Sequence, residues 1–138
     1  MSSVSARRLG AVFLASVALV AAGCGGGSSS GSSSRPSTEA TLKFVEPTPG
    51  ATTSSDVAVQ VDLKDGKIVT TTDGALTSTD GHLHVTLDGK LVSMTYGTKQ
   101  TLEDITPGLH SLQAEFVAKD HAPFTNRPKA FVRFNVAL

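Results

Sequence analysis

The side chains of this chain that could most readily bind a metal ion belong to its four histidines: His82, His84, His110 and His121. Two of them lie in the pattern Gly81-His82-Leu83-His84-Val85. Residues two apart on a β-strand point to the same face, so His82 and His84 should share one face. Leu83 and Val85 then point to the opposite face, toward the core. Paired imidazoles at this spacing can chelate Zn²⁺ or Cu²⁺, and they need at least one further ligand.

The segment around His121 is expected to supply that ligand. In an immunoglobulin-like sandwich, the strand of His82 and the strand of His110 are antiparallel neighbours, so the start of the first lies near the end of the second. The second strand ends just before Asp120 and His121. The sequence therefore predicts a copper or zinc site made of His82, His84 and His121. Asp120 would be an additional ligand, or the carboxylate that orients an imidazole.

Other interpretations of this end of the domain stay open at this stage. The three histidines could instead form a hydrogen-bonded polar patch or a ligand-recognition surface. Phe124 could contact a partner from its loop, or it could plug the end of the sandwich. Tyr96, which precedes Gly97, is a second aromatic residue that could contact a ligand or partner.

His110 is predicted to have a structural role. It lies at the opposite end of its strand, near Asp88, more than ~30 Å along an extended chain from the end that leads to His121. It follows Pro107-Gly108, at the corner where immunoglobulin-like domains usually have a tyrosine whose hydroxyl bonds nearby backbone. We therefore expect His110 to replace that tyrosine and to take no part in the metal site.

Residue patterns for catalysis are missing from the sequence. None of the many Ser and Thr residues lies in a nucleophile-elbow pattern, and the single cysteine is Cys24. Glu103 and Asp104 are adjacent, so they point to opposite faces of a strand or lie in a solvated loop. The Asp-Gly pairs lack the ligand spacing of a calcium loop and indicate turns. We therefore expect a protein that is not an enzyme.

The segment up to Cys24 predicts a lipid anchor. Arg7 and Arg8 precede an apolar stretch of roughly 12–14 residues, which is typical of a signal peptide and shorter than the ~20 residues of a permanent span. Small residues then lead to Cys24 in a pattern that resembles the lipobox of bacterial lipoproteins, although Ala21 stands where leucine is preferred. Residues 1–23 are thus predicted to be removed, with lipid chains attached to Cys24. The protein should be held on the extracytoplasmic face of a bacterial cell membrane.

The remaining chain divides into a tether and one domain. Residues 24–40 are predicted to be the lipidated cysteine and a flexible tether, because Gly and Ser dominate there. Residues 41–138 form one domain with a modest core. Without Arg7 and Arg8, ten basic and twelve acidic residues remain, a net charge of −2, and no basic run is present. Nucleic-acid binding is therefore not expected, and the expected partners are the membrane and an unidentified protein, polymer or small ligand.

Period-2 alternation between turn signals predicts β-strands throughout the domain. The clearest stretches are 57–63, 82–88, 90–95, 109–116 and 130–138. Asp88-Gly89 predicts a two-residue hairpin. About seven short strands in roughly 100 residues favour an all-β fold, namely a single immunoglobulin-like or fibronectin-type antiparallel sandwich, over a small closed barrel.

Three motifs together resemble a group of uncharacterised bacterial secreted proteins with an immunoglobulin-like domain: Gly81-His82-x-His84, Asp88-Gly89 and Pro107-Gly108-x-His110. The resemblance covers residues 41–138 and implies that fold and an extracytoplasmic location, without an established activity. The cysteine with its Gly/Ser tether similarly resembles lipoproteins of actinobacteria. The sequence thus predicts a membrane-anchored lipoprotein with a non-catalytic binding or structural module. The alternative is a copper- or zinc-binding protein.

Overall fold

The computed structural model describes residues 34–138, which consist of β-strands and connecting loops. The all-β prediction is confirmed for this part of the chain. Cys24, the predicted signal peptide and the start of the predicted tether lie outside the described residues, so lipidation stays a prediction. Residues 34–138 offer no helix that could cross a membrane.

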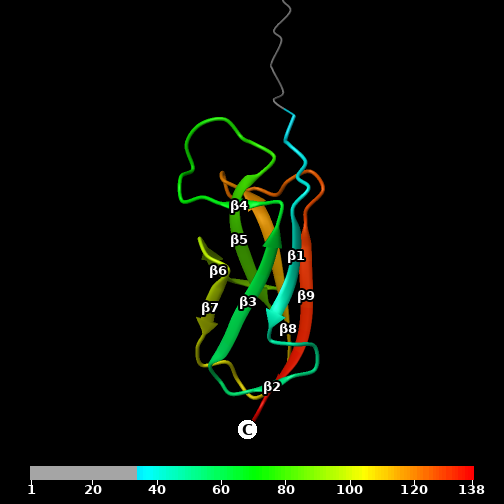
Figure 1. The fold of residues 1–138 in the computed structure, drawn as a ribbon. Helices are drawn as coiled ribbons and strands as arrows, with labels where there is room; N and C mark the ends of the chain where they lie inside the picture. Colours follow the sequence, from blue (N-terminus) through cyan, green and yellow to red (C-terminus); the bar gives the residue numbers. More distant parts are fainter. Residues whose placement is uncertain (1–33) are drawn as a thin grey trace, which may run out of the picture. The chain divides into compact units, whose positions relative to one another are not determined.

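A small antiparallel sheet forms one layer of the domain (Figure 1). Its strands follow the order β1-β3-β7, with β3 in the middle. Their bounds are Thr41–Glu46 for β1, Val57–Lys64 for β3 and Lys99–Leu102 for β7. The register sets Phe44 opposite Val61, and Val57 opposite Leu102. Since residues opposite one another point to the same face, these apolar side chains all turn toward the second sheet.

The second sheet is larger, and it positions the histidines. Its main path runs β2-β9-β8-β5-β4, and β6 also pairs with β5. The bounds are Thr52–Thr53 for β2, Lys67–Ile68 for β4, Asp80–Leu87 for β5, Lys90–Thr95 for β6, Gly108–Ala118 for β8 and Lys129–Val136 for β9. One edge of β5 therefore pairs with β8, while the other pairs first with β4 and then with β6.

The strands are distributed between the sheets as in an immunoglobulin-type sandwich. β1, β3 and β7 correspond to strands A, B and E, and β5, β8 and β9 correspond to strands C, F and G. The described residues contain nine strands rather than about seven, because β2 and β4 add two residues each. These two pair in parallel with β9 and β5, so the larger sheet is not wholly antiparallel as predicted. Pairings of two residues are too short to produce an alternating pattern.

The core lies between the two sheets and follows the alternation along each strand. Its central members are Val57, Val59, Val61, Leu83, Val85, Leu112, Ala114, Phe116, Val132, Phe134 and Val136. Burying a large apolar side chain stabilises the fold by about 1.5–3 kcal/mol. This burial holds Leu83 and Val85 inward, and the intervening His82 and His84 must therefore lie on the outer face of the larger sheet.

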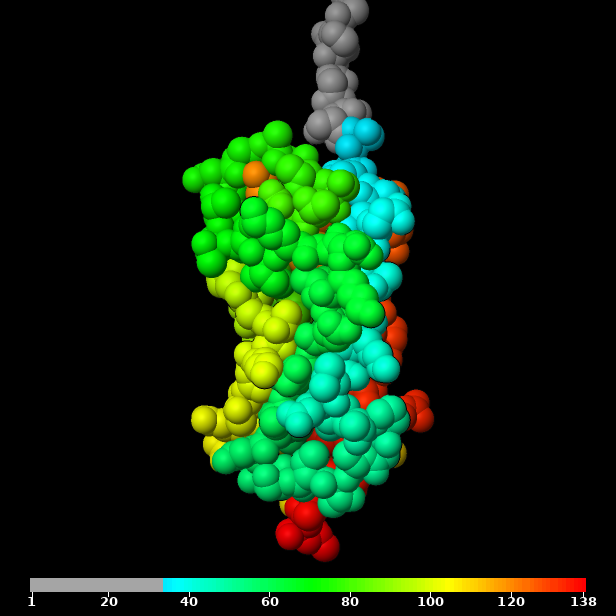
Figure 2. Space-filling view, viewed as in Figure 1, coloured from blue at the N-terminus to red at the C-terminus, as the bar shows by residue number. Residues whose placement is uncertain are grey.

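Residues 35–40 belong to the folded domain rather than to the tether, which corrects the predicted boundary at residue 41. Thr38 and Ala40 are buried. The Thr38 backbone N–H donates to Asn126 Oδ1, and Asn126 Nδ2 donates back to the Thr38 carbonyl. Figure 2 shows this segment, in cyan, against the body of the domain. Composition could not reveal the docking, because the segment has no apolar pattern and is held largely by hydrogen bonds.

Candidate metal centre

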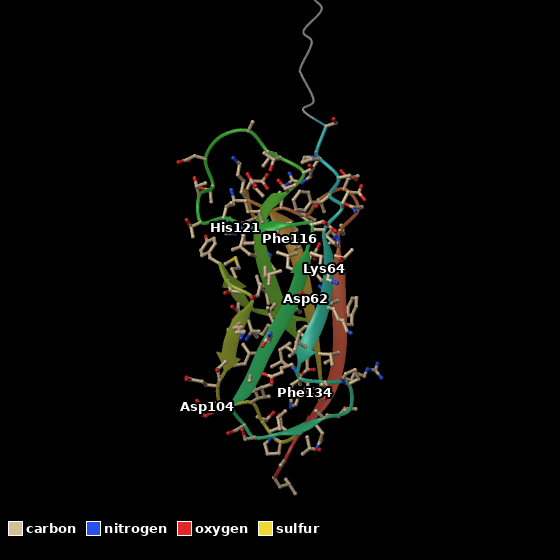
Figure 3. All side chains as sticks on the ribbon, in the orientation of Figure 1. Asp62, Lys64, Asp104, Phe116, His121 and Phe134 are labelled. Carbon is tan, nitrogen blue, oxygen red and sulfur yellow. The ribbon has the colours of Figure 1, made fainter. Side chains whose placement is uncertain are left out.

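Three of the four histidines meet at one end of the larger sheet. One ring nitrogen from each of His82, His84 and His121 lies within 4.8 Å of the other two. His82 Nε2 is 2.8 Å from His121 Nδ1, and the ring centroids of His84 and His121 are 5.8 Å apart. In Figure 3, His121 lies at the end of the domain where β5 begins. The predicted proximity of the three histidines is confirmed.

Strand β5 presents His82 and His84 on one face, as its alternation predicts. Leu83 and Val85, which alternate with the two histidines, are fully buried in the core on the opposite face of the strand. The two imidazoles differ in exposure, because His82 is 1% exposed while His84 is only partly buried. The metal-binding end is thus partly enclosed, with His82 as its innermost member.

Gly81 allows β5 to approach β8 closely beside His82. A Cβ atom at this position would lie 2.0 Å from the Val117 carbonyl oxygen and 2.9 Å from the Phe116 ring. Neither contact is compatible with any side chain, so only glycine fits. The glycine of the Gly-His-x-His motif therefore sets how near His82 comes to the end of β8.

The loop after β8 carries His121 back over the sheet. Val117 forms an isolated antiparallel bridge with Pro123, and the Ala118 N–H donates to the Ala122 carbonyl at 3.1 Å. His121 itself is at the tip, with φ of 65° and its N–H bonded to the Ala118 carbonyl at 3.0 Å. The left-handed conformation turns the chain sharply there. These bonds return the imidazole to the outer face of the sheet, beside His82.

Arg35 clamps this loop from outside. Its guanidinium donates to Asp120 Oδ1 at 2.5 Å, to the Ala122 carbonyl at 3.0 Å and to the Pro123 carbonyl. These acceptors flank His121 on both sides in the chain. Asp120 therefore lies next to the site with its carboxylate bonded to Arg35. It does not belong to the group of described residues that could share an ion, so its proposed role as a ligand gains no support.

Phe124 is a core residue, which corrects its assignment as a ligand or partner contact. It is 1% exposed and stacks on Phe116, with ring centroids 5.4 Å apart. The alternative interpretation, a plug at the end of the sandwich, is therefore correct. By packing there, Phe124 also anchors the far end of the His121 loop.

Other side chains cover His82. Val117, which is directly opposite His82 in the register, is equally buried on the outer face. The Tyr96 ring centroid is 5.3 Å from that of His82, and 46% of Tyr96 is exposed. Lys119 Nζ donates to the Asp73 carbonyl of the 69–79 loop, and Figure 2 shows orange atoms, the colour of the chain near residue 120, within the green surface. Tyr96 thus stays a predicted contact, exposed at the rim of the site.

Burial keeps two of the histidines neutral. Desolvation, followed by the neighbouring imidazoles of His121 and His84, lowers the pKa of His82 to about 4, against a smaller opposing effect of Asp120. Desolvation and then His121 also lower the pKa of His84, opposed by Glu115. A neutral imidazole is the form that binds a metal ion. His82 is therefore ready to bind a metal at neutral pH without releasing a proton.

The geometry of the three imidazoles fits one transition-metal ion. His84 Nε2 is buried and has no hydrogen-bond partner within residues 34–138, a state that costs about 1–3 kcal/mol. Nitrogens bound tetrahedrally to one ion at about 2 Å are about 3.3 Å apart. The widest pair, within 4.8 Å, must therefore close by up to about 1.5 Å when an ion binds. Three imidazoles leave at least one coordination position for a further ligand.

A row of side chains crosses the outer face through His84. The register sets Met94 of β6 opposite His84 on one side and Glu115 of β8 opposite it on the other. Glu115 accepts from Arg127 Nε at 2.9 Å and Nη2 at 3.2 Å, and it pairs with Lys129 at 3.7 Å. Its carboxylate is thus neutralised by two cations. Met94 is 54% exposed and lies on the open side of His84.

His110 occupies a structural corner, as predicted. Its Nε2 lies 2.7 Å from the Thr106 carbonyl and its Nδ1 lies 2.6 Å from Asp88 Oδ2. The hydrogen bond to Asp88 and then that to Thr106 raise the pKa of His110. Reciprocally, the bond from His110 and then the Ser111 N–H lower the pKa of Asp88. Two acceptors facing one ring favour the doubly protonated imidazolium.

Sequence reasoning missed two residues that shape the site, Arg35 and Met94. Arg35 stands alone in a Ser-rich stretch, so no local signal points to its contact 85 residues away. The Asp88-Gly89 hairpin, continued without a break, would set Ser93 opposite His84. The register shift between Val85 and Thr86 brings Met94 there instead.

Comparisons with known proteins leave the function of this site open. No protein-family model matches the chain, and no curated protein matches it. Two solved structures are similar over 72% of this chain, each with a TM-score of 0.49: an engineered protein at 13% identity and the endo-beta-1,4-mannanase from Thermotoga petrophila at 18% identity. The match spans 20% of each of those longer chains.

Proposed function

We propose that this domain binds one copper or zinc ion through His82, His84 and His121. The observation that carries the proposal is the convergence of one ring nitrogen from each of the three imidazoles within 4.8 Å. In addition, His84 Nε2 is buried without a hydrogen-bond partner in the described residues. A purely structural polar patch would be expected to pair that nitrogen, because buried polar groups in folded proteins are nearly always hydrogen-bonded.

The way the ligands are held also supports metal binding. His82 and His84 come from a central strand whose alternate residues are locked in the core. His121 comes from a loop fixed by backbone bonds, by Phe124 and by Arg35. Ligands held on rigid elements lose little conformational entropy when a metal ion binds. The site is thus largely formed before the ion arrives.

The cellular setting in this proposal comes from the sequence. Lipid on Cys24 would hold the protein on the extracytoplasmic face of a bacterial membrane, with the Gly/Ser segment as a tether. Copper and zinc ions at that face would then meet the domain directly. The proposed role is to bind the ion there, without catalysis.

Titration of the protein lacking residues 1–24 with ZnCl₂ and CuCl₂ tests the proposal. This form keeps all the described residues, which belong to one compact unit, and it retains Arg35. We expect one ion per chain by calorimetry. With Zn²⁺, the ring signals of His82, His84 and His121 should move together in NMR spectra while those of His110 stay in place. The absence of such shifts at micromolar metal would refute the proposal, and His110→Gln is the control that should bind normally.

A second proposed function is the broader one, a non-catalytic module that contacts a partner, surface polymer or small ligand. Tyr96 favours it, because this aromatic side chain is 46% exposed at the rim of the histidine site. Aromatic residues are enriched where proteins recognise ligands. Replacing Tyr96 with Ala should then weaken retention of the protein on isolated cell envelopes in the absence of metal. Unchanged retention would argue against a contact at this residue.

A further inference from the structure

The open side of the histidine site faces a methionine. Met94 is the cross-strand partner of His84 in the antiparallel pair of β5 and β6. Side chains directly opposite one another in such a pair rise from the same face, with Cβ atoms about 4.5–5.5 Å apart. The unbranched methionine side chain has three rotatable bonds, so its sulfur can swing toward the neighbouring imidazole.

The Met94 side chain lies on the outer face of the sheet, where the packing of the domain leaves it accessible. It is 54% exposed and does not belong to the hydrophobic core. Because it is exposed, this side chain adds little hydrophobic stabilisation to the fold, and its sulfur is open to solvent. On the opposite side of His84, Glu115 is already occupied by Arg127 and Lys129. Among the cross-strand neighbours of His84, Met94 is therefore the side chain with a free donor atom.

A thioether changes which ion the site prefers. Soft sulfur ligands select Cu(I), whereas imidazoles bind zinc and copper alike. Three imidazoles and one thioether make a four-coordinate set of neutral ligands. Neutral ligands suit a singly charged ion, because they leave no excess negative charge in a partly buried site.

We propose that Met94 completes the site as a thioether ligand and that the ion bound by His82, His84, His121 and Met94 is Cu(I). This inference rests on the proposed function, metal binding by the three histidines, and adds the fourth ligand and the oxidation state. It involves binding only, with the reduced ion supplied as such.

Competition for Cu(I) tests the assignment. The protein lacking residues 1–24 is titrated under argon with Cu(I) in excess ascorbate against bicinchoninate, and Zn²⁺ affinity is measured in parallel. The variant is Met94→Leu, which keeps the size and apolar character of the side chain. The matched control is Leu91→Ala, a change at an exposed apolar residue of the same strand that pairs with Thr86 and not with a histidine.

We expect Met94→Leu to weaken Cu(I) binding about tenfold or more and to change Zn²⁺ binding by less than about threefold. X-ray absorption at the copper edge should show a sulfur neighbour in the unaltered protein and none in the variant. The control should match the unaltered protein in both affinities.

The two proposals fail in different ways. Unchanged Cu(I) affinity in Met94→Leu, with no sulfur neighbour in either protein, would overturn the role of Met94 while leaving the histidine site intact. Equal losses for Cu(I) and Zn²⁺ would also overturn it, since they would show damage to the histidines rather than loss of a soft ligand. Failure of the unaltered protein to bind any of these ions would overturn both proposals together.

Discussion

The two ends of strands β5 and β8 each hold histidine side chains, in opposite chemical states. At one end His110 has an acceptor at each ring nitrogen, the Thr106 carbonyl and the Asp88 carboxylate. At the other end His84 Nε2 is buried without a partner in the described residues, and His82 shares one hydrogen bond with His121. The hydrogen-bonding groups of the first end are thus paired within the protein, while at the second end the His84 nitrogen has no partner among residues 34–138.

The pKa directions express the same contrast. Hydrogen bonds to Asp88 and Thr106 raise the pKa of His110, whereas burial together with the neighbouring imidazoles lowers the pKa of His82 to about 4. One end thus favours a charged imidazolium that stabilises the fold, and the other favours neutral imidazoles that can bind an ion. The role of a histidine in this domain therefore depends on whether its surroundings supply hydrogen-bond acceptors, and not on its presence in a strand.

The largest expected effect comes from replacing His84 with Leu. Metal affinity should fall by more than about 100-fold, because two imidazoles bind one ion much less tightly than three. The metal-free protein should become more stable by about 1 kcal/mol, since the unpaired buried nitrogen is removed. Calorimetric titration and urea unfolding measure the two quantities. Strong destabilisation of the metal-free variant would instead show that His84 stabilises the fold, as His110 does at the other end.

Removing the Arg35 clamp should have an intermediate effect. Arg35→Ala frees the loop that holds His121, and metal affinity should fall about tenfold, as is typical when a group that orients a ligand is lost. Affinity is measured by competition with a chelator, and Arg35→Lys should restore part of it. Arg133→Ala, a change of the same kind on β9 opposite Ser111, is the control. Equal affinity in Arg35→Ala and Arg133→Ala would show that the clamp does not position His121.

At the satisfied end, His110→Ala should reduce stability and leave metal binding unchanged. The variant loses hydrogen bonds to the Thr106 carbonyl and to Asp88, and we expect unfolding to require about 1–2 kcal/mol less. Urea unfolding at pH 6 measures the loss, and zinc titration checks the metal site. A fall in zinc affinity would mean that the two ends are coupled.

The smallest effect concerns pH. Because its folded pKa is raised, the stabilisation from His110 is fully present below its unfolded pKa of about 6.5 and is lost as pH rises through the folded value. The pKa of Asp88 is lowered in the folded protein, so the stabilisation that Asp88 contributes is lost as pH falls through its folded pKa. The stability difference between the unaltered protein and His110→Ala should therefore be largest between about pH 4 and 6.5.

Titration of the metal-free protein by NMR adds the other end to this test. His82 should stay neutral until pH falls to about 4, while His110 should still be protonated above pH 6.5. Because the unfolded chain binds a proton at His82 sooner, this end should lose stability as pH falls below about 6.5. Similar titration midpoints for the two residues would contradict the comparison.

The alternation of apolar residues was enough to predict the sandwich. Val57, Val59 and Val61 mark one buried face and Leu83 and Val85 another, and period-2 spacing assigns both without further information. The same rule predicts that His82 and His84 share a face. It could not assign Phe124, which follows an irregular loop and whose burial depends on stacking with Phe116.

The sequence by itself determined the all-β class, the shared face of two histidines and the expectation that His121 returns beside them, because these depend on local spacing and on strand order. Only the tertiary structure decided that His82 is buried, that Arg35 clamps the His121 loop and that a register shift sets Met94 opposite His84. The physical reason is the separation along the sequence over which each interaction acts. Alternation acts between near neighbours, whereas His82 and His121 meet across 39 residues and Arg35 and Asp120 across 85, where packing and loop geometry choose the contacts.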